Sequence, residues 1–180
     1  MQALSFEGQV AIVTGAGGGL GREHALALAK RGAKVLVNDL GGSLDGSGGS
    51  VSAAQAVVNE IVALGGQAMA NGASVTDYAA VQAMVQQAID AWGRVDILVN
   101  NAGYAEYCRT EHMPADMFER TLCHYLHVPF VLSQAAIAPM RARGAGWILN
   151  LGSVTALAPV RPYTDFERHG GIAAYTAAKA

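Results

Sequence analysis

The sequence predicts a doubly wound α/β domain built on a parallel β-sheet, and three observations support this prediction. Short runs rich in β-branched residues alternate along the chain with longer segments of helical periodicity. The strand-like runs are continuously apolar, which is typical of parallel strands that helices cover on both faces. At 180 residues, 52% of them hydrophobic and 14% charged, the chain can bury a core of domain size.

The first part of the chain predicts three strands separated by helices. In order, the expected elements are a strand over 10–15, a helix over 20–32, a strand over 33–40, a glycine-rich loop over 41–50, a helix over 51–66 and a strand over 67–74. In the first helix, Leu20, Ala27 and Leu28 are expected on one face, and Gly32 is expected to end it.

The second part continues the alternation. The expected elements are a helix over 78–93, a strand over 94–103, a helix over 115–127 that continues over 130–144, a strand over 147–153 and a helix that begins at 172. Asp77 is expected to cap its helix, Pro114 to start the next one, and Pro129 to kink it. Strand–helix–strand repetition predicts right-handed crossovers and a parallel sheet.

Composition excludes several classes of function. The net charge of −2 and a pI of about 6.2 do not indicate a nucleic-acid partner or a basic membrane surface. No apolar stretch approaches the ~18 residues of a membrane-spanning helix, and the chain opens without a secretory signal. The two cysteines, Cys108 and Cys123, form no CxxC motif, so we expect a reduced, cytoplasmic location.

A glycine-rich turn joins the first strand to the first helix. The stretch TGAGGGLG does not fit G-x-G-x-x-G, because Leu20 stands at the last glycine position, but it fits T-G-x-x-x-G-x-G through Gly15, Gly19 and Gly21. Glycines let the backbone approach a pyrophosphate, and a helix N-terminus offers free N–H groups. The alternative is an ordinary glycine-rich turn.

An acid and an amide pair follow two of the strands. Asp39 ends the second strand, where a carboxylate can accept hydrogen bonds from both adenosine ribose hydroxyls and would repel a 2′-phosphate. This favours NAD over NADP, unless Asp39 merely caps the loop. Asn100 and Asn101 follow the fourth strand, where side-chain amides can tie strands together and line a cofactor, or simply form an Asn-rich turn.

A tyrosine and a lysine stand four residues apart in YTAAK, at Tyr175 and Lys179. On a helix this spacing places both on one face. Free tyrosine titrates near pH ~10, and a neighbouring ammonium stabilises a phenolate. The pair can therefore act as an acid/base couple, although such pairs are also common on ordinary helix surfaces.

Together, TGAGGGLG, Asp39, NNAG, Ser153 after ILNLG, and YTAAK resemble the short-chain dehydrogenase/reductase family over the whole chain. VNDLGG further resembles the dehydrogenase part of peroxisomal multifunctional enzymes, which oxidise 3-hydroxyacyl-CoA. The resemblance implies a Rossmann-like fold, with hydride transfer between NAD and a secondary alcohol or ketone. It also implies a homodimer or homotetramer, with contacts made by the long kinked helix and the final helix.

The resemblance implies roles for individual residues. Tyr175 would exchange the proton, Lys179 would hold the nicotinamide ribose and favour the phenolate, and Ser153 would orient the substrate oxygen. The catalytic residues would be Ser153, Tyr175 and Lys179. The cofactor-binding residues would be Gly15, Gly17, Gly19, Leu20, Gly21, Asp39, Ser74, Val75, Asn101, Ala102, Gly103, Tyr175 and Lys179.

The sequence departs from the family pattern in three places. Tyr125 stands where family members usually carry an asparagine that relays protons through an ordered water. Ser153 and Tyr175 are 22 residues apart, more than is usual, so 154–174 looks like an insertion. Within this stretch, Arg161, Arg168 and His169 either contact an anionic substrate or lie in a solvated loop, and the solvated loop has the better support. Tyr163 in the same stretch lacks a lysine four residues later.

Family members also continue beyond position 180. We therefore expect residues 1–180 to be a single dinucleotide-binding catalytic domain that is incomplete at its C-terminus. No metal is expected, because His124 and His127 lack a nearby third ligand. The alternative function is an NAD-binding structural or regulatory protein with impaired catalysis, which the tyrosine at position 125 favours and the intact Ser153, Tyr175 and Lys179 oppose.

Overall fold

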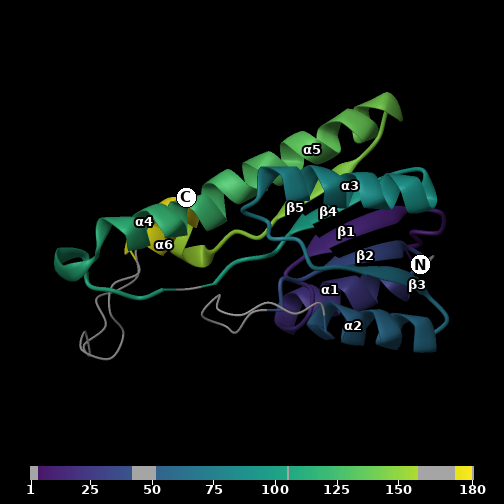
Figure 1. Ribbon diagram of the computed structural model, residues 1–180, viewed down its shortest axis with the longest axis horizontal. Coiled ribbons are helices and arrows are strands. Elements are labelled where there is room, and N and C mark those ends of the chain that lie inside the picture. The colour runs from purple at the N-terminus through teal and green to yellow at the C-terminus, as the bar shows by residue number, and fades with distance from the viewer. Residues whose placement is uncertain (1–3, 42–51, 105, 158–172, 180) are drawn as a thin grey trace.

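The computed structural model describes residues 4–41, 52–104, 106–157 and 173–179, and the statements below concern these residues. One sheet of five strands, all parallel, forms its centre in the order β3-β2-β1-β4-β5 (Figure 1). The strands are β1 Val10–Thr14, β2 Lys34–Asn38, β3 Gln67–Asn71, β4 Ile97–Asn100 and β5 Trp147–Asn150. The predicted doubly wound α/β fold is confirmed.

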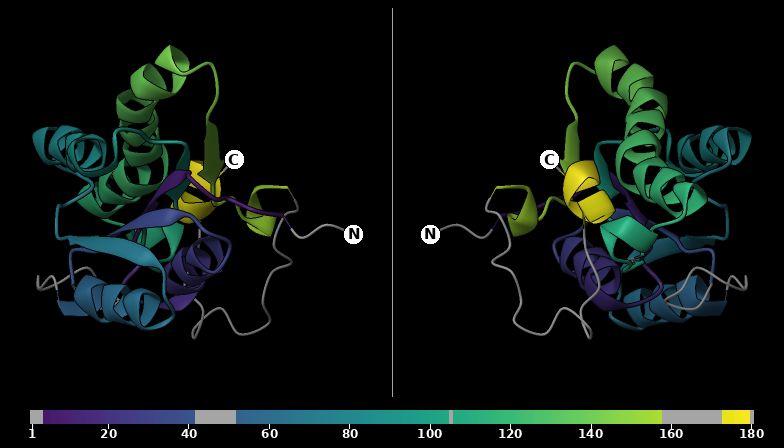
Figure 2. Two further views of the ribbon diagram at one scale, coloured as in Figure 1. Left: turned by 90° about the vertical axis from the view of Figure 1, so that its right-hand side faces the viewer. Right: turned by 90° about the vertical axis from the view of Figure 1, so that its left-hand side faces the viewer.

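Helices cover both faces of the sheet (Figure 2). The helices are α1 Gly19–Ala29, α2 Ser52–Ala63, α3 Tyr78–Trp92, α4 Ala115–Leu122, α5 Val128–Ala142 and α6 Ala173–Lys179, with short 3₁₀ turns at Thr110–His112 and Val154–Ala156. Helices α1 and α2 pack on one face, and α3 and α5 on the other. The predicted cap of α3 is confirmed, because the Asp77 side chain accepts a hydrogen bond from the Ala80 amide at 3.1 Å.

Each central strand contributes to two separate hydrophobic cores. Val10 and Ile12 of β1 face the core under α3 and α5, whereas Ala11 and Val13 face the core under α1 and α2. Successive strand residues point to opposite faces, so a strand with both faces covered must be apolar at every position. This explains why the strands read as continuous apolar runs.

The three residues expected on one face of α1 differ in burial, and Leu28 packs against the core under α1 and α2. Leu20 is 68% exposed, whereas Gly21, Ala25 and Leu26 are buried. A helix packs through residues three and four apart, and the small Gly21 and Ala25, four apart, let α1 lie close to the sheet. The helix also ends at Ala29, before Gly32, which adopts a φ of +96° in the turn to β2.

The long helix over α4 and α5 is interrupted as expected, although not by a simple kink. Residues Cys123–His127 form a π-helical segment, and the Val128 amide donates to the Cys123 carbonyl five residues earlier. Pro129 follows at once and has no N–H to continue an α-helical pattern. The helix therefore continues past this point through one π-helical turn, and such turns are frequent at functional sites.

A buried carboxylate joins several elements at the amino edge of the sheet. Asp96 accepts hydrogen bonds from the Val10 amide at 2.8 Å and from Arg94 at 2.7 Å, and lies 3.5 Å from the Arg143 guanidinium. Its backbone carbonyl accepts from the Trp147 amide. Burial raises the pKa of Asp96, but these donors and the two arginine charges hold its pKa below the usual value.

Strand β5 lies at one side of the sheet and is more exposed than the others. Within the part of the chain that the structure describes, it pairs only with β4. Trp147 is 74% exposed and Leu149 50% exposed.

In the same described ranges, no helix is long and apolar enough to cross a bilayer.

Candidate active site

The glycine turn lies at the carboxyl edge of the sheet, between β1 and α1. Gly15 has a φ of +61°, and a Cβ there would lie 2.8 Å from the Cα of Ala102. A Cβ on Gly21 would meet the Gly15 carbonyl and the Asn101 amide nitrogen. Glycine is therefore required at both positions, because the backbone of the turn, the start of α1 and the segment after β4 lie in direct contact.

The other side of the same turn is open. A Cβ on Gly18 or Gly19 would meet nothing within 4 Å, and Leu20 is exposed. Gly18 caps α1 without a side chain, so no cap hydrogen bond satisfies the amides of the first turn. A bare helix N-terminus beside open backbone fits a pyrophosphate group.

Asp39 lies directly against the glycine turn. Its Oδ2 accepts a hydrogen bond from the Gly17 amide at 2.8 Å, and its Oδ1 accepts one from the Gly41 amide at 2.7 Å. A Cβ on Gly17 would lie 2.8 Å from the carboxylate, so glycine is needed for this approach. Asp39 thus does cap the loop, and each carboxylate oxygen retains acceptor capacity for another donor.

Thr14 and Asn101 tie the ends of β1 and β4 together. The Thr14 hydroxyl donates to the Val99 carbonyl and accepts from the Asn101 and Ala102 amides at 3.1 and 3.0 Å. The Asn101 side chain donates to the Thr14 and Gly15 carbonyls. The expected strand-tying role of the Asn101 amide is confirmed. Thr14 has no role in the sequence analysis, although it is the first residue of TGAGGGLG.

The segment after β3 comes to the same edge. Asn38 donates to the Asn71 side chain and to the Ala73 carbonyl, each at 2.9 Å, which fixes the chain leading to Ser74 and Val75. The Ser74 hydroxyl lies 2.8 Å from that of Thr76, and Val75 packs against the core under α3 and α5.

Tyr175 and Lys179 lie together on α6, as their spacing predicts. The Lys179 ammonium donates to the Leu151 carbonyl, directly after β5, so it lies at the carboxyl edge of the sheet. It also lies 5.8 Å from the centre of the Tyr175 ring and 4.5 Å from that of Tyr125. The Tyr125 and Tyr175 rings meet at 87° with centroids 5.0 Å apart. Sequence reasoning treated Tyr125 only as a missing asparagine and did not find this contact.

Ser153 lies between β5 and the 3₁₀ turn Val154–Ala156. Its hydroxyl oxygen accepts hydrogen bonds from the Thr155 amide at 3.3 Å and from the Thr155 hydroxyl at 2.9 Å. Among the described residues, no hydrogen bond joins Ser153 to Tyr175 or Lys179. The 3₁₀ turn itself packs against α6. Arg161, Tyr163, Glu167, Arg168 and His169 lie outside the described residues.

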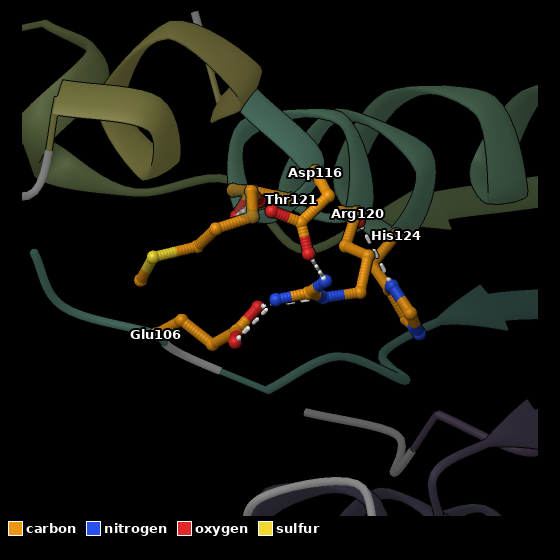
Figure 3. A network of polar contacts seen from close by, with 6 residues as sticks. Glu106, Asp116, Arg120, Thr121 and His124 are labelled. Atoms are coloured by element: carbon orange, nitrogen blue, oxygen red, sulfur yellow. Dashed lines mark hydrogen bonds and ion pairs between the residues drawn. The ribbon is translucent and has the colours of Figure 1, made fainter. Parts of the chain in front are cut away.

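An ion pair between Glu106 and Arg120 ties the segment after Gly103 to α4 (Figure 3). Arg120 lies between Glu106, at 3.1 Å, and Asp116, with which it forms a close pair. His124 Nδ1 lies 3.0 Å from the Arg120 carbonyl oxygen, and its ring packs edge-on against Tyr104 at 4.5 Å. No group of three His, Cys, Asp or Glu side chains in the described ranges could hold a metal ion.

Comparisons with known proteins agree with this geometry. Residues 9–180 match the family model for short chain dehydrogenases. The chain is 44% identical over 179 residues to peroxisomal multifunctional enzyme type 2 of Drosophila melanogaster and 45% identical over 154 residues to peroxisomal hydratase-dehydrogenase-epimerase of Saccharomyces cerevisiae. Among solved structures, it superposes on 7 alpha-hydroxysteroid dehydrogenase, complexed with NADH and 7-oxo glycochenodeoxycholic acid, with a TM-score of 0.84 and 34% identity.

The matches cover most of this chain but less of the relatives. The fly and yeast matches cover 98% and 86% of this chain, but only 27% and 17% of those proteins. The hydroxysteroid dehydrogenase match covers 97% of this chain and 61% of that one. This chain therefore resembles only a part of each relative.

Proposed function

The chain belongs to the short chain dehydrogenase family, which is a family of oxidoreductases, and from this premise we propose that it transfers a hydride between NAD and a secondary alcohol or ketone. One observation carries the proposal: the Lys179 ammonium lies beside the Tyr175 ring at the sheet edge that also holds the glycine turn. Ligands bind at this carboxyl edge in open α/β sheets.

The residues at the turn fit a dinucleotide. The open backbone at Gly18 and Gly19, with the uncapped start of α1, would hold the pyrophosphate. Asp39 would accept hydrogen bonds from the adenosine ribose with its remaining lone pairs, which favours NAD over NADP. We propose that Ser74, Val75, Asn101, Ala102 and Gly103 line the rest of the cofactor.

When bound, the nicotinamide supplies the hydride chemistry, and the chain supplies alignment and proton transfer. Tyr175 would take the proton from the substrate hydroxyl in oxidation and return it in reduction. Lys179 would favour the anionic phenol and hold the nicotinamide ribose. Ser153 would donate its hydroxyl hydrogen to the substrate oxygen, because its hydroxyl oxygen only accepts in its two hydrogen bonds with Thr155.

A 3-hydroxyacyl thioester is the proposed substrate class. The support is the similarity to the yeast peroxisomal hydratase-dehydrogenase-epimerase and to the fly peroxisomal multifunctional enzyme type 2, together with the VNDLGG segment. The steroid in the solved relative belongs to that protein. Turnover of secondary alcohols but of no 3-hydroxyacyl thioester would contradict this substrate class and leave the reaction class in place.

The test combines NAD binding with turnover by the complete protein. NADH absorbance should rise with at least one member of a panel of 3-hydroxyacyl thioesters and secondary alcohols. Tyr175→Phe should abolish turnover while NAD still binds, and Tyr78→Phe, at a 55% exposed tyrosine of α3, should change neither. Wild-type protein that binds NAD but never forms NADH would favour the alternative, an NAD-binding structural or regulatory protein.

Self-association is the second part of the proposal, as a homodimer or homotetramer. Phe118, Leu126, Phe130 and Ile137 are 40%, 63%, 63% and 42% exposed along α4, the π-helical segment and α5. Part of this surface, between Glu119 and Phe130, forms an open apolar groove of about 510 Å³. Exposed apolar patches of this kind are typical of interfaces.

The compartment stays a prediction. The proposed reduced, cytoplasmic location rests on the cysteine pattern, because Cys108 and Cys123 form no CxxC motif. The names of the fly and yeast relatives place those proteins in peroxisomes. Imaging a tagged complete protein in its own cell, against markers of both compartments, would decide between them.

A further inference from the structure

We infer that Tyr125 positions Lys179: its aromatic face holds the ammonium in place, and its hydroxyl ties that arrangement to the loop after Gly103. The inference rests on the proposed function, because it gives a reason for the precise placement of the proposed catalytic lysine. It also assigns a role to the residue that departs most clearly from the family pattern.

The first support is the geometry of the three side chains. The Lys179 ammonium lies 4.5 Å from the Tyr125 ring centre, closer than the 5.8 Å to the ring centre of Tyr175. A cation within ~6 Å of a ring face is attracted by the negative potential of that face. The perpendicular packing of the two tyrosine rings, at 5.0 Å, then places Tyr175 next to the same cation.

The second support is that the lysine needs such a partner. Burial lowers the pKa of Lys179, so the site itself disfavours the charged form. Within the described part of the chain, its polar contact is the Leu151 carbonyl, and no carboxylate forms an ion pair with it. Among the described residues, the Tyr125 and Tyr175 rings also lie beside the ammonium, and Tyr125 is the nearer.

The third support is that Tyr125 is itself held on three sides. Its hydroxyl donates to the Tyr104 carbonyl, and burial raises its pKa, so the phenol stays neutral. A Cβ on Gly103 would lie 2.5 Å from the Tyr125 ring, so glycine leaves the space that the ring fills. Glu106, two residues after Tyr104, forms an ion pair with Arg120 of α4 (Figure 3).

An asparagine at position 125 would offer the lysine no ring face. The π-helical segment that carries Tyr125 packs against α6, which brings the ring to the lysine. The water-mediated proton route expected from a family asparagine therefore has no counterpart in the side chain at this position. In its place, this chain presents a neutral aromatic surface that fixes the cation without exchanging protons with it.

The first experiment observes Lys179 directly, without turnover. Lysines of the complete protein are reductively methylated with ¹³C, and the Lys179 signal is assigned by its absence in Lys179→Arg. We expect ring currents to displace this signal from those of Lys30 and Lys34. The displacement should persist in Tyr125→Phe and largely disappear in Tyr125→Leu and Tyr125→Met. An undisplaced signal, or one unchanged in both ring-free variants, would overturn the inference.

The second experiment measures kinetics on the same variants. Loss of the ring should lower kcat about fivefold to tenfold, with the KM for NAD changed less, and Tyr125→Phe should restore most of kcat. Tyr78→Leu, which removes an exposed tyrosine elsewhere, should leave both constants unchanged. Equal losses in the phenylalanine and leucine variants would assign the effect to the hydroxyl and contradict the inference.

The two proposals fail in different ways. If the wild type turns over no substrate but the Lys179 signal responds to the Tyr125 variants as expected, the proposed function fails and the positioning role stands. If the wild type is active and the signal is insensitive to Tyr125, the positioning role fails alone. Melting curves for each variant show whether the fold is intact before either result is read.

Discussion

At the scale of single residues, the candidate site is made by close contacts that only particular side chains permit. Gly17 admits the Asp39 carboxylate, Gly15 admits Ala102, and Gly103 admits the Tyr125 ring. Each contact joins segments far apart in the sequence. The consequences of changing single residues should therefore depend on what lies opposite them and not on the motif alone.

Alanine at Gly17 should weaken NAD binding about tenfold. Its Cβ would lie 2.8 Å from the Asp39 carboxylate and 2.7 Å from the Ala53 Cβ, so the acid must move, at an overpacking cost of ~1–3 kcal/mol. Titration calorimetry with NAD measures the effect. Val62→Ala, at a 55% exposed position on α2, is the control and should leave NAD affinity unchanged. Equal affinities for both variants would show that the Asp39 contact does not matter for binding.

Asp39→Ala combined with Leu40→Arg should shift cofactor choice towards NADP. Leu40 is 42% exposed, so an arginine there can reach solvent and pair with a 2′-phosphate. The ratio of kcat/KM for NADP to that for NAD should rise at least tenfold, even though loss of the Asp39 hydrogen bonds to Gly17 and Gly41 will weaken the turn. An equal loss for both cofactors would argue against a ribose role for Asp39.

At the scale of elements, buried polar groups fix how strands and helices meet. Asp96 connects β1, β5 and the end of α5 at the amino edge of the sheet. Asn101 and Thr14 do the same for β1 and β4 at the carboxyl edge. The two edges differ in what they leave free: the amino-edge carboxylate is saturated with donors, whereas the carboxyl edge keeps an open glycine turn.

Asp96→Asn should destabilise the fold at neutral pH by ~3 kcal/mol, because it breaks a buried charge pair. The pKa of Asp96 is lower in the folded chain, so its stabilisation is full above the unfolded value of about 3.9 and is lost as the pH falls through the folded value. The difference between wild type and variant should therefore shrink below about pH 4. Urea unfolding across this range measures it, with the exposed Asp90→Asn as control. A difference independent of pH would contradict this.

The element order was predictable because it depends on local signals. Continuous apolar runs located the strands, and Asp77 located the start of α3. The buried face of α1 was not predictable in the same way, because Gly21 and Ala25 pack by being small. The π-helical segment and the contact of Tyr125 with Lys179 depend on how α4, α5 and α6 meet, for which a single sequence carries no local signal.

At the scale of the whole molecule, the outer surface of α4 and α5 exposes several large apolar side chains. Its apolar side chains lie on the face turned away from the sheet, and the sheet side of α5 is already filled by the core under α3. The proposed self-association would cover this surface. The expected domain organisation, one catalytic domain over residues 1–180, remains a proposal.

Phe130→Glu should convert the proposed dimer or tetramer into a smaller species. A charge at the 63% exposed Phe130, inside the apolar groove, would have to be buried in the interface without a partner. Light scattering coupled to size-exclusion chromatography gives the mass. Val62→Glu, at a 55% exposed position on α2, is the control and should leave the mass unchanged. A wild-type protein that is already monomeric would contradict the proposed self-association.

The alternation of β1 between two cores has a consequence for how the sequence can change. Val10 and Ile12 belong to one core, and Ala11 and Val13 to the other, so a shift of the strand by one residue would exchange the large and small members of the two layers. Insertion or deletion of one residue within such a strand should therefore be far more damaging than any conservative replacement. Length variation should be tolerated in the connecting segments, where it leaves the pairing of the strands intact.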